Sequence, residues 1–178
     1  GDKIDKKKLK MFAGSFLVLV SIYLFLACLS YFFTWTSDQD RILGKGFFEF
    51  LFDSNQEPVE NWLGKFGAWS SHFLIYQLFG FTSIGLCFLM FVSGVSVLFD
   101  YKLVNIRRAY VVVLAYMIWG SLFLGFFAEN VNYLGGTFGF YLNQWLMLTV
   151  GGIGTFAFIA VTFYLTTTLI FNPNYIAF

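Results

Sequence analysis

Long uncharged stretches, separated by short polar segments, dominate the hydrophobic pattern of this chain. A helix needs about 20 apolar residues to cross the roughly 30 Å hydrocarbon core of a bilayer. The longest stretch follows Glu129, because residues 130–178 contain no Asp, Glu, Lys or Arg at 49 successive positions. The pattern predicts an all-α integral membrane protein with four spanning helices. These are expected at about residues 11–33, 71–98, 109–128 and 150–171.

The last uncharged stretch is too long for one crossing and is interrupted by glycines. As one helix, residues 130–178 would extend roughly 74 Å at about 1.5 Å per residue. We predict a turn over Leu134–Gly139, a short re-entrant or interfacial helix over Phe138–Thr149, and a second break before the fourth span. Backbone groups freed by a break cannot face lipid, so the glycines must pack on protein, within the bundle or on a neighbouring subunit. The glycines concerned are Gly135, Gly136, Gly139, Gly151 and Gly152.

The segment between the first two spans, about residues 34–70, contains a helical pattern of its own. Apolar residues recur at helical spacing from Val59 to Phe73, which predicts an amphipathic helix on the bilayer surface. Its aromatic residues Trp62, Phe66 and Trp69 are expected either to anchor this helix or to present a docking surface to an extracytoplasmic partner.

Charge adds an orientation to this arrangement. Charged residues make up only 12% of the chain, against about 25% in soluble domains. The first ten residues and the loop at about 99–108 hold eight of the 11 Lys and Arg residues. The positive-inside rule then predicts that this loop and both termini are cytoplasmic, with loops at about 34–70 and 129–149 outside. The residues that set this topology are Lys6, Lys7, Lys8, Lys10, Lys102, Arg107 and Arg108.

Catalytic chemistry is not indicated by the sequence, and we expect no enzyme activity, cofactor or metal site in this chain. His72, the only histidine, is expected to be a hydrogen-bonded residue at the start of the second span. Glu129 is expected at the end of a span rather than in a proton relay. Cys28 and Cys87 are expected near opposite ends of adjacent spans, unpaired and well separated.

The order of these features resembles the N-terminal membrane domain of FtsK/SpoIIIE-type DNA translocases. The matching stretches are SYFFTWTSDQD, NWLGKFGAW leading to LFGF, and LGGTFG followed by GGIGT. The second stretch places Asn61, Gly64, Gly67, Ala68, Phe79 and Gly80 where that family has similar residues. The Pro-rich turn that often follows the first span in the family is absent here, and the outer loop is longer and more aromatic.

This resemblance implies a membrane anchor and oligomerisation domain in the bacterial inner membrane. It implies a cytoplasmic ATP-driven motor beyond Phe178, held at the division septum and acting in chromosome segregation. The implied partners are membrane lipid, further copies of the chain and other bacterial division proteins, with DNA contacted only through the motor. If the glycines form subunit contacts, replacing Gly135 and Gly139 with Leu should weaken self-association.

Two alternatives come from other functional classes. One is a stand-alone membrane scaffold of the division machinery. The other is a small channel or permease, whose pathway would have only Asn143 and Gln144 as polar lining in the short helix.

Overall fold

The computed structural model describes residues 2–54, 57–100, 104–127 and 132–171, all of whose regular secondary structure is helical. Four helical segments in these ranges are long and apolar enough to cross a membrane, which confirms the predicted fold class. In chain order the elements are α1 (Asp2–Ile42), α2 (Phe47–Phe52), α3 (Gly64–Ser71), η1 (His72–Phe79), η2 (Gly80–Ser83), α4 (Ile84–Phe99), α5 (Ile106–Phe127) and α6 (Asn132–Phe171).

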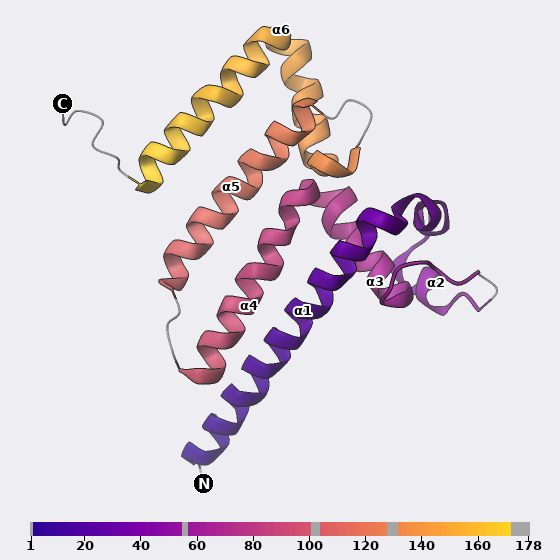
Figure 1. The fold of residues 1–178 in the computed structure, drawn as a ribbon, viewed down its shortest axis with the longest axis vertical. Helices are drawn as coiled ribbons and strands as arrows, with labels where there is room; N and C mark the ends of the chain where they lie inside the picture. The colour runs from indigo at the N-terminus through magenta and orange to yellow at the C-terminus, as the bar shows by residue number, and fades with distance from the viewer. Residues whose placement is uncertain (1, 55–56, 101–103, 128–131, 172–178) are drawn as a thin grey trace.

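The spanning helices form a row rather than a closed bundle. Helix α1 packs on α4, α4 on α5 and α5 on α6. Seen along the shortest axis of the molecule, α1, α4, α5 and the last part of α6 lie side by side in that order (Figure 1). Such a layer covers each helix only on its flanks and leaves two broad faces open.

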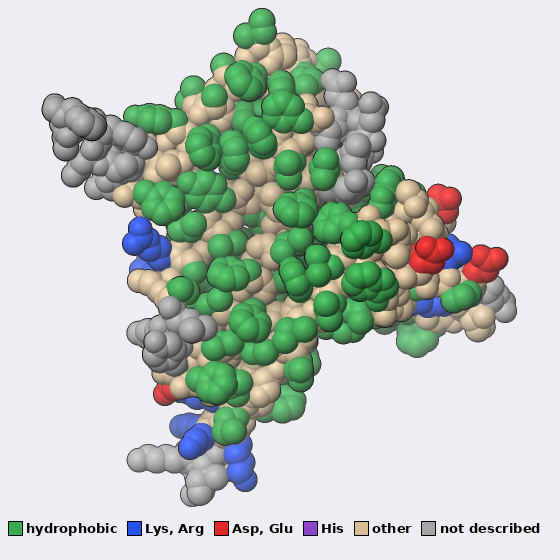
Figure 2. Space-filling model, in the orientation of Figure 1, with side chains coloured by type: hydrophobic (Ala, Val, Ile, Leu, Met, Phe, Trp, Pro, Cys, Tyr) green, Lys and Arg blue, Asp and Glu red, His purple; other side chains and the backbone are tan. Residues whose placement is uncertain are grey.

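The helical layer and the adjoining part of α6 expose large apolar side chains. The most exposed include Leu148, Ile153 and Leu169, with 84%, 91% and 83% of their surface accessible. Figure 2 shows apolar side chains over the helical layer and charged side chains gathered near its ends. Soluble monomers rarely expose apolar patches of this extent, whereas a lipid-facing surface requires them.

Helix α1 extends beyond the predicted first span. It contains 41 residues, and residues 34–42 continue the helix although the hydrophobic pattern assigns them to the outer loop. The extension forms one wall of a unit at one end of the helical layer, which we call the outer cap after the outer loop predicted there. The outer cap consists of residues 34–54 and 57–71 and so includes α2 and α3.

The second spanning segment is broken, which the sequence pattern did not indicate. The backbone leaves helical geometry at Leu78 (φ −98°, ψ −112°), and Gly80 has a positive φ of 69°. The segments η1 and η2 lie on either side of this break, and a regular α-helix resumes only at Ile84. The predicted span at 71–98 is therefore a straight helix only over its second half.

The last segment has the two breaks that its glycines predict. Helix α6 is interrupted at Gly136 (φ 64°, ψ −179°) and at Gly151 (φ 72°, ψ 173°). The part between these breaks crosses one end of α5, and the part after Gly151 turns back alongside α5 (Figure 1).

The predicted separation of the two cysteines is wrong. Cys28 and Cys87 belong to one buried cluster with Tyr31 and Ile75, and their thiols contact each other. The reason is the different length of the helices. Because α1 continues to Ile42, Cys28 lies well inside it, and because α4 begins only at Ile84, Cys87 lies in its first turn.

Candidate functional site

The outer cap is fixed to α1 by a buried carboxylate. Asp38 is only 1% exposed and accepts hydrogen bonds from the backbone nitrogens of Glu60 (2.7 Å) and Asn61 (2.9 Å). A guanidinium nitrogen of Arg41 lies 3.9 Å from the same carboxylate. Hydrogen bonds to an ionised acceptor are stronger than neutral ones, so Asp38 holds the returning chain against the helix extension.

Asn61 extends this attachment toward the membrane. Its amide nitrogen donates to the carbonyl of Ala27 (3.2 Å) and to the hydroxyl of Ser71 (3.4 Å). The hydroxyl of Ser30 accepts a hydrogen bond from the backbone nitrogen of Trp62 at 3.0 Å. Positions three or four apart share a helix face, so these residues of α1 lie on one face of the helix. That face holds the segment just before α3 by hydrogen bonds.

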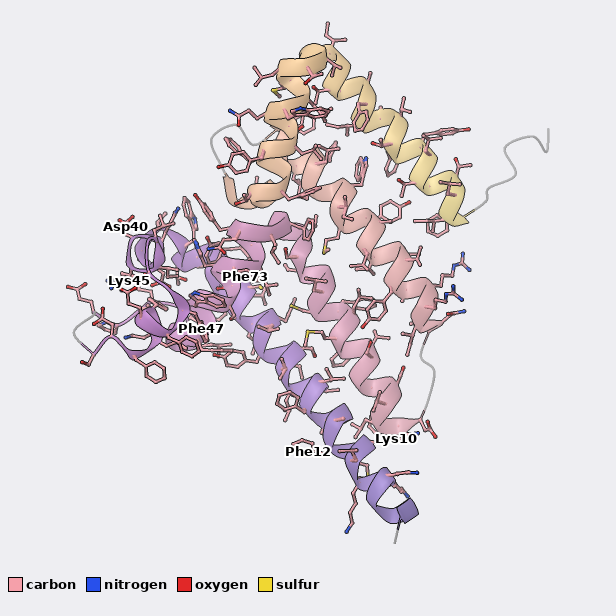
Figure 3. The ribbon with its side chains drawn as sticks, turned by 180° about the vertical axis from the view of Figure 1, so that it is seen from behind. Lys10, Phe12, Asp40, Lys45, Phe47 and Phe73 are labelled. Atoms are coloured by element: carbon pink, nitrogen blue, oxygen red, sulfur yellow. The ribbon has the colours of Figure 1, made fainter. Side chains whose placement is uncertain are left out.

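The predicted aromatic residues lie on the outer cap but do not share one helix face. Trp62 precedes α3, which begins at Gly64 with a φ of 66°, and stacks on Phe33 at 6.1 Å between ring centroids. Trp62 is 62% exposed and Phe66 is 48% exposed. Trp69 is partly buried and contacts Phe47 and Phe73, which lie on the same side of the cap (Figure 3).

At the centre of the molecule the break in the second segment meets the first break in α6. A Cβ added at Gly136 would overlap the backbone nitrogen of Gly80, and one added at Gly80 would overlap the carbonyl of Leu134. Both glycines have a positive φ, which other residues rarely adopt. Gly80 and Gly136 therefore form a contact between two broken backbones that no side chain can enter. We call this contact the buried break.

Hydroxyl groups satisfy the carbonyls that surround the buried break. Thr137 donates to the carbonyl of Tyr76 (2.9 Å), and Thr82 donates to Met117 (2.9 Å). Ser121 donates to the carbonyl of Gly135 at 2.5 Å. An unsatisfied backbone group in hydrocarbon costs several kcal/mol, so these bonds allow irregular backbone at membrane depth.

The five predicted packing glycines have two different environments. A Cβ at Gly135 would lie 2.6 Å from the Cα of Gly125, and one at Gly139 would overlap the carbonyl of Ser121. These two glycines and Gly136 thus pack within the chain. Gly151 and Gly152 have no atom within 4 Å of an added Cβ, so this second interruption, the open break, faces away from the described part of the chain.

The basic residues that predict the topology lie at two helix starts. Lys6, Lys7, Lys8 and Lys10 are in the first turns of α1, and Arg107 and Arg108 are in the first turn of α5. Figure 2 shows Lys and Arg side chains at these two positions and most acidic side chains on the outer cap. Lys102 and Glu129 lie outside the described residues.

His72 is hydrogen-bonded, as predicted, but it is buried. Its Nδ1 lies 3.4 Å from the hydroxyl of Tyr31, and its ring stacks on Tyr76. In the part of the chain that the structure describes, no three His, Cys, Asp or Glu side chains lie close enough to hold a metal ion. The arrangement is one of packing and hydrogen bonding.

The sequence did not indicate the residues that fix the outer cap to α1 or those that surround the buried break. Asp38 was assigned to the outer loop and Asn61 to the polar side of the predicted amphipathic helix, while Ser121 and Thr137 are of types common in membrane helices. A signal existed, because Asp38 lies in SYFFTWTSDQD, and Asn61 and Gly80 lie in the stretch from NWLGKFGAW to LFGF. A charged or amide side chain within these matching stretches could have been predicted to form hydrogen bonds with the backbone.

The family model for the 4TM region of DNA translocase FtsK/SpoIIIE matches residues 6–178 of this chain. Comparison with curated proteins and with solved structures finds no match.

Proposed function

Since the chain belongs to the family of 4TM regions of FtsK/SpoIIIE DNA translocases, we propose that it anchors such a translocase in the bacterial inner membrane. It tethers a cytoplasmic ATP-driven motor at the division septum during cell division and chromosome segregation. The observation that carries this proposal is the family match over nearly the whole chain. The motor itself, and any contact with DNA, lies outside this domain.

The distribution of charge supports cytoplasmic termini. A chain that crosses a membrane four times returns to the side on which it started, and the four candidate spans therefore support an end of α6 on the same side as the lysines of α1. The positive-inside rule places that side in the cytoplasm. A motor joined after α6 is then held close to the membrane, where tethering raises the effective concentration of each motor for its neighbours.

The open row of helices supports self-association. The last part of α6 has α5 on one flank and exposes Ile153 and Leu169 elsewhere. The open break at Gly151 and Gly152 lies at the start of this part, and two adjacent glycines permit close approach of another helix. We place the contact between copies here. Gly135, Gly136 and Gly139 serve the fold of each copy.

The outer cap supports contact with other division proteins. Trp62 and Phe66 are large, half-exposed aromatic residues on a unit that hydrogen bonds hold against α1. Aromatic side chains on a rigid support are typical anchors of protein interfaces. The polar cap residues around them would provide the rim of such an interface.

The test is the position of the chain in dividing cells. A fusion of residues 1–178 to a cytoplasmic fluorescent protein is expressed in a rod-shaped bacterium. We expect fluorescence in the membrane with a band at midcell. The variant Trp62→Ala/Phe66→Ala should stay in the membrane but lose the midcell band. The control Phe16→Ala, an exposed position far from the cap, should retain it. Uniform membrane fluorescence of the unaltered chain would contradict septal tethering.

A further inference from the structure

A pocket of about 770 Å³ lies between the first turns of α1 and the last turn of α4. Its wall combines ammonium groups with apolar side chains. It is lined by Lys6, Lys7, Lys10, Met11, Val97, Leu98, Phe99 and Asp100. Figure 3 shows Lys10 beside the end of α4, whereas Phe12 points away from that helix.

The pocket exists because the two helices are held close above it and end at different depths below it. A Cβ at Gly14 would lie 2.7 Å from the backbone nitrogen of Leu98, and one at Gly94 would lie 2.9 Å from that of Val18. Helix α4 ends at Phe99, one residue beyond this contact. The residues of α1 before Gly14 extend roughly 18 Å further, at about 1.5 Å per residue. The pocket lies beside this projecting end of α1.

Positive charge exceeds negative charge in the lining. Lys7 and Lys10 line the pocket beside one carboxylate, that of Asp100, which lies 3.7 Å from Lys10. The side chains of this pair are 65% and 90% exposed. An exposed pair of this kind is weak and exchanges readily with other ions. The pocket therefore has a surplus of cationic donors for an anion.

Apolar contacts continue from the pocket along the same two helices. Leu98 and Met11 lie beside the lysines, whose aliphatic stems can cover apolar groups while the ammonium groups reach the polar region. A second hollow of about 400 Å³ lies further along α1 and α4, lined in part by Ile22, Phe25 and Phe91. Met11 and Phe25 are roughly 21 Å apart along α1. That distance exceeds the ~15 Å depth of one leaflet.

We propose that this pocket binds an anionic phospholipid of the leaflet that faces the N-terminus. The phosphate of its headgroup lies at Lys7 and Lys10, and an acyl chain lies against Met11 and Leu98. Basic pockets between membrane helices suit such headgroups, because each lysine contributes attraction and the hydrocarbon supplies the remaining contact. Asp100 weakens the site, since its carboxylate repels the phosphate. This lipid recognition goes beyond anchoring and is measurable whether or not the chain carries a motor.

The experiment is a titration of the 178-residue chain, purified in a non-ionic detergent, followed by native mass spectrometry. The probes are phosphatidylglycerol, phosphatidylcholine and glycerol 1-phosphate. We expect phosphatidylglycerol to bind more tightly than phosphatidylcholine. Glycerol 1-phosphate carries the same anion without acyl chains and should not displace the lipid. Equal binding of the two lipids would overturn the proposal, and displacement by glycerol 1-phosphate would identify a site for free phosphate esters instead.

Matched variants separate this pocket from diffuse attraction. Lys7→Gln/Lys10→Gln should weaken phosphatidylglycerol binding about 25-fold, from about fivefold per lysine near a membrane surface. Asp100→Asn should strengthen it. The control Lys8→Gln lies next to Lys7 on the same helix but outside the lining, and should change binding less than twofold. The control Arg107→Gln/Arg108→Gln removes two charges from the start of α5 and should behave similarly. Controls that weaken binding as much as the pocket variants would contradict a specific site.

Discussion

Two breaks in one helix have the same local geometry and opposite surroundings. At Gly136 and Gly151 the φ and ψ angles agree within about 10°, and each position belongs to a Gly-Gly pair. Gly136 lies against Gly80 and the carbonyl of Leu78, so a Cβ there would overlap backbone atoms. Gly151 has open space around it. The same backbone feature therefore serves two purposes, and its environment decides which.

The surroundings differ because only the buried break has a second irregular backbone opposite it. There, the hydroxyls of Ser121 and Thr137 donate hydrogen bonds to carbonyls of other segments. Ser121 donates to the carbonyl of Gly135, and Thr137 donates to that of Tyr76. At the open break, Thr155 donates to the carbonyl of Gly151 within its own helix, at 2.9 Å. The buried break thus connects separate segments of one copy. The open break leaves a surface that another copy can use.

The largest expected effect comes from adding one methyl group at each break. Gly136→Ala requires a positive φ, at about 1–3 kcal/mol, and overpacks the contact with Gly80, at about a further 1–3 kcal/mol. Gly151→Ala has open space, so only the same backbone cost of about 1–3 kcal/mol from its φ is expected there. The free energy of unfolding is measured by titration with dodecyl sulfate in mixed micelles. Equal losses at both positions would contradict the difference between the two breaks.

A smaller effect is expected at neighbouring glycines that have ordinary helical φ. Gly139→Leu would force this part of α6 away from Ser121 and should destabilise the chain by about 1–3 kcal/mol. A Cβ at Gly152 has open space for 4 Å around it, so Gly152→Leu should change the free energy of unfolding by no more than about 0.5 kcal/mol. Far-ultraviolet circular dichroism and retention on a sizing column report the fold. An intact Gly139→Leu variant would mean that α5 and α6 do not pack as described.

The smallest effect is expected from removing single hydroxyls. Ser121→Ala or Thr137→Val each leaves a buried carbonyl without its donor and should cost about 1–2 kcal/mol. Thr155→Val removes a bond made within one helix turn and should cost less than about 0.5 kcal/mol. The same detergent titration compares the three variants. A larger loss for Thr155→Val than for the other two would reverse the comparison.

The sequence predicted the breaks in α6 but not the break at Gly80. Hydrophobic length located the four spans, and the paired glycines located both breaks in α6, because both signals are local. The break at Gly80 was missed, since a single glycine between phenylalanines looks like part of a helix. The backbone breaks at Gly80 because it packs against Gly136, which is 56 positions away in the sequence. A local sequence pattern cannot indicate such a distant contact.

The outer cap shows the same limit. Residues 34–42 are polar enough to be assigned to a loop, yet they continue α1. Here Asp38 accepts hydrogen bonds from the backbone nitrogens of Glu60 and Asn61. The predicted amphipathic helix from Val59 is interrupted for a related reason. Asn61 bonds to Ala27, and Gly64 then begins α3 at a positive φ. The aromatic residues were found by their type, and their arrangement depended on these tertiary bonds.

The most direct test of the central claim is the mass of the chain reconstituted in lipid nanodiscs. The unaltered chain should form an oligomer, and Gly152→Leu should remain folded but dissociate toward the monomer, because the leucine fills the surface where a second copy approaches. Tyr141→Leu changes an exposed side chain on the first part of α6 and is the control that should leave the oligomer intact. A monomeric unaltered chain, or an unchanged oligomer in Gly152→Leu, would contradict the assignment of the open break to self-association.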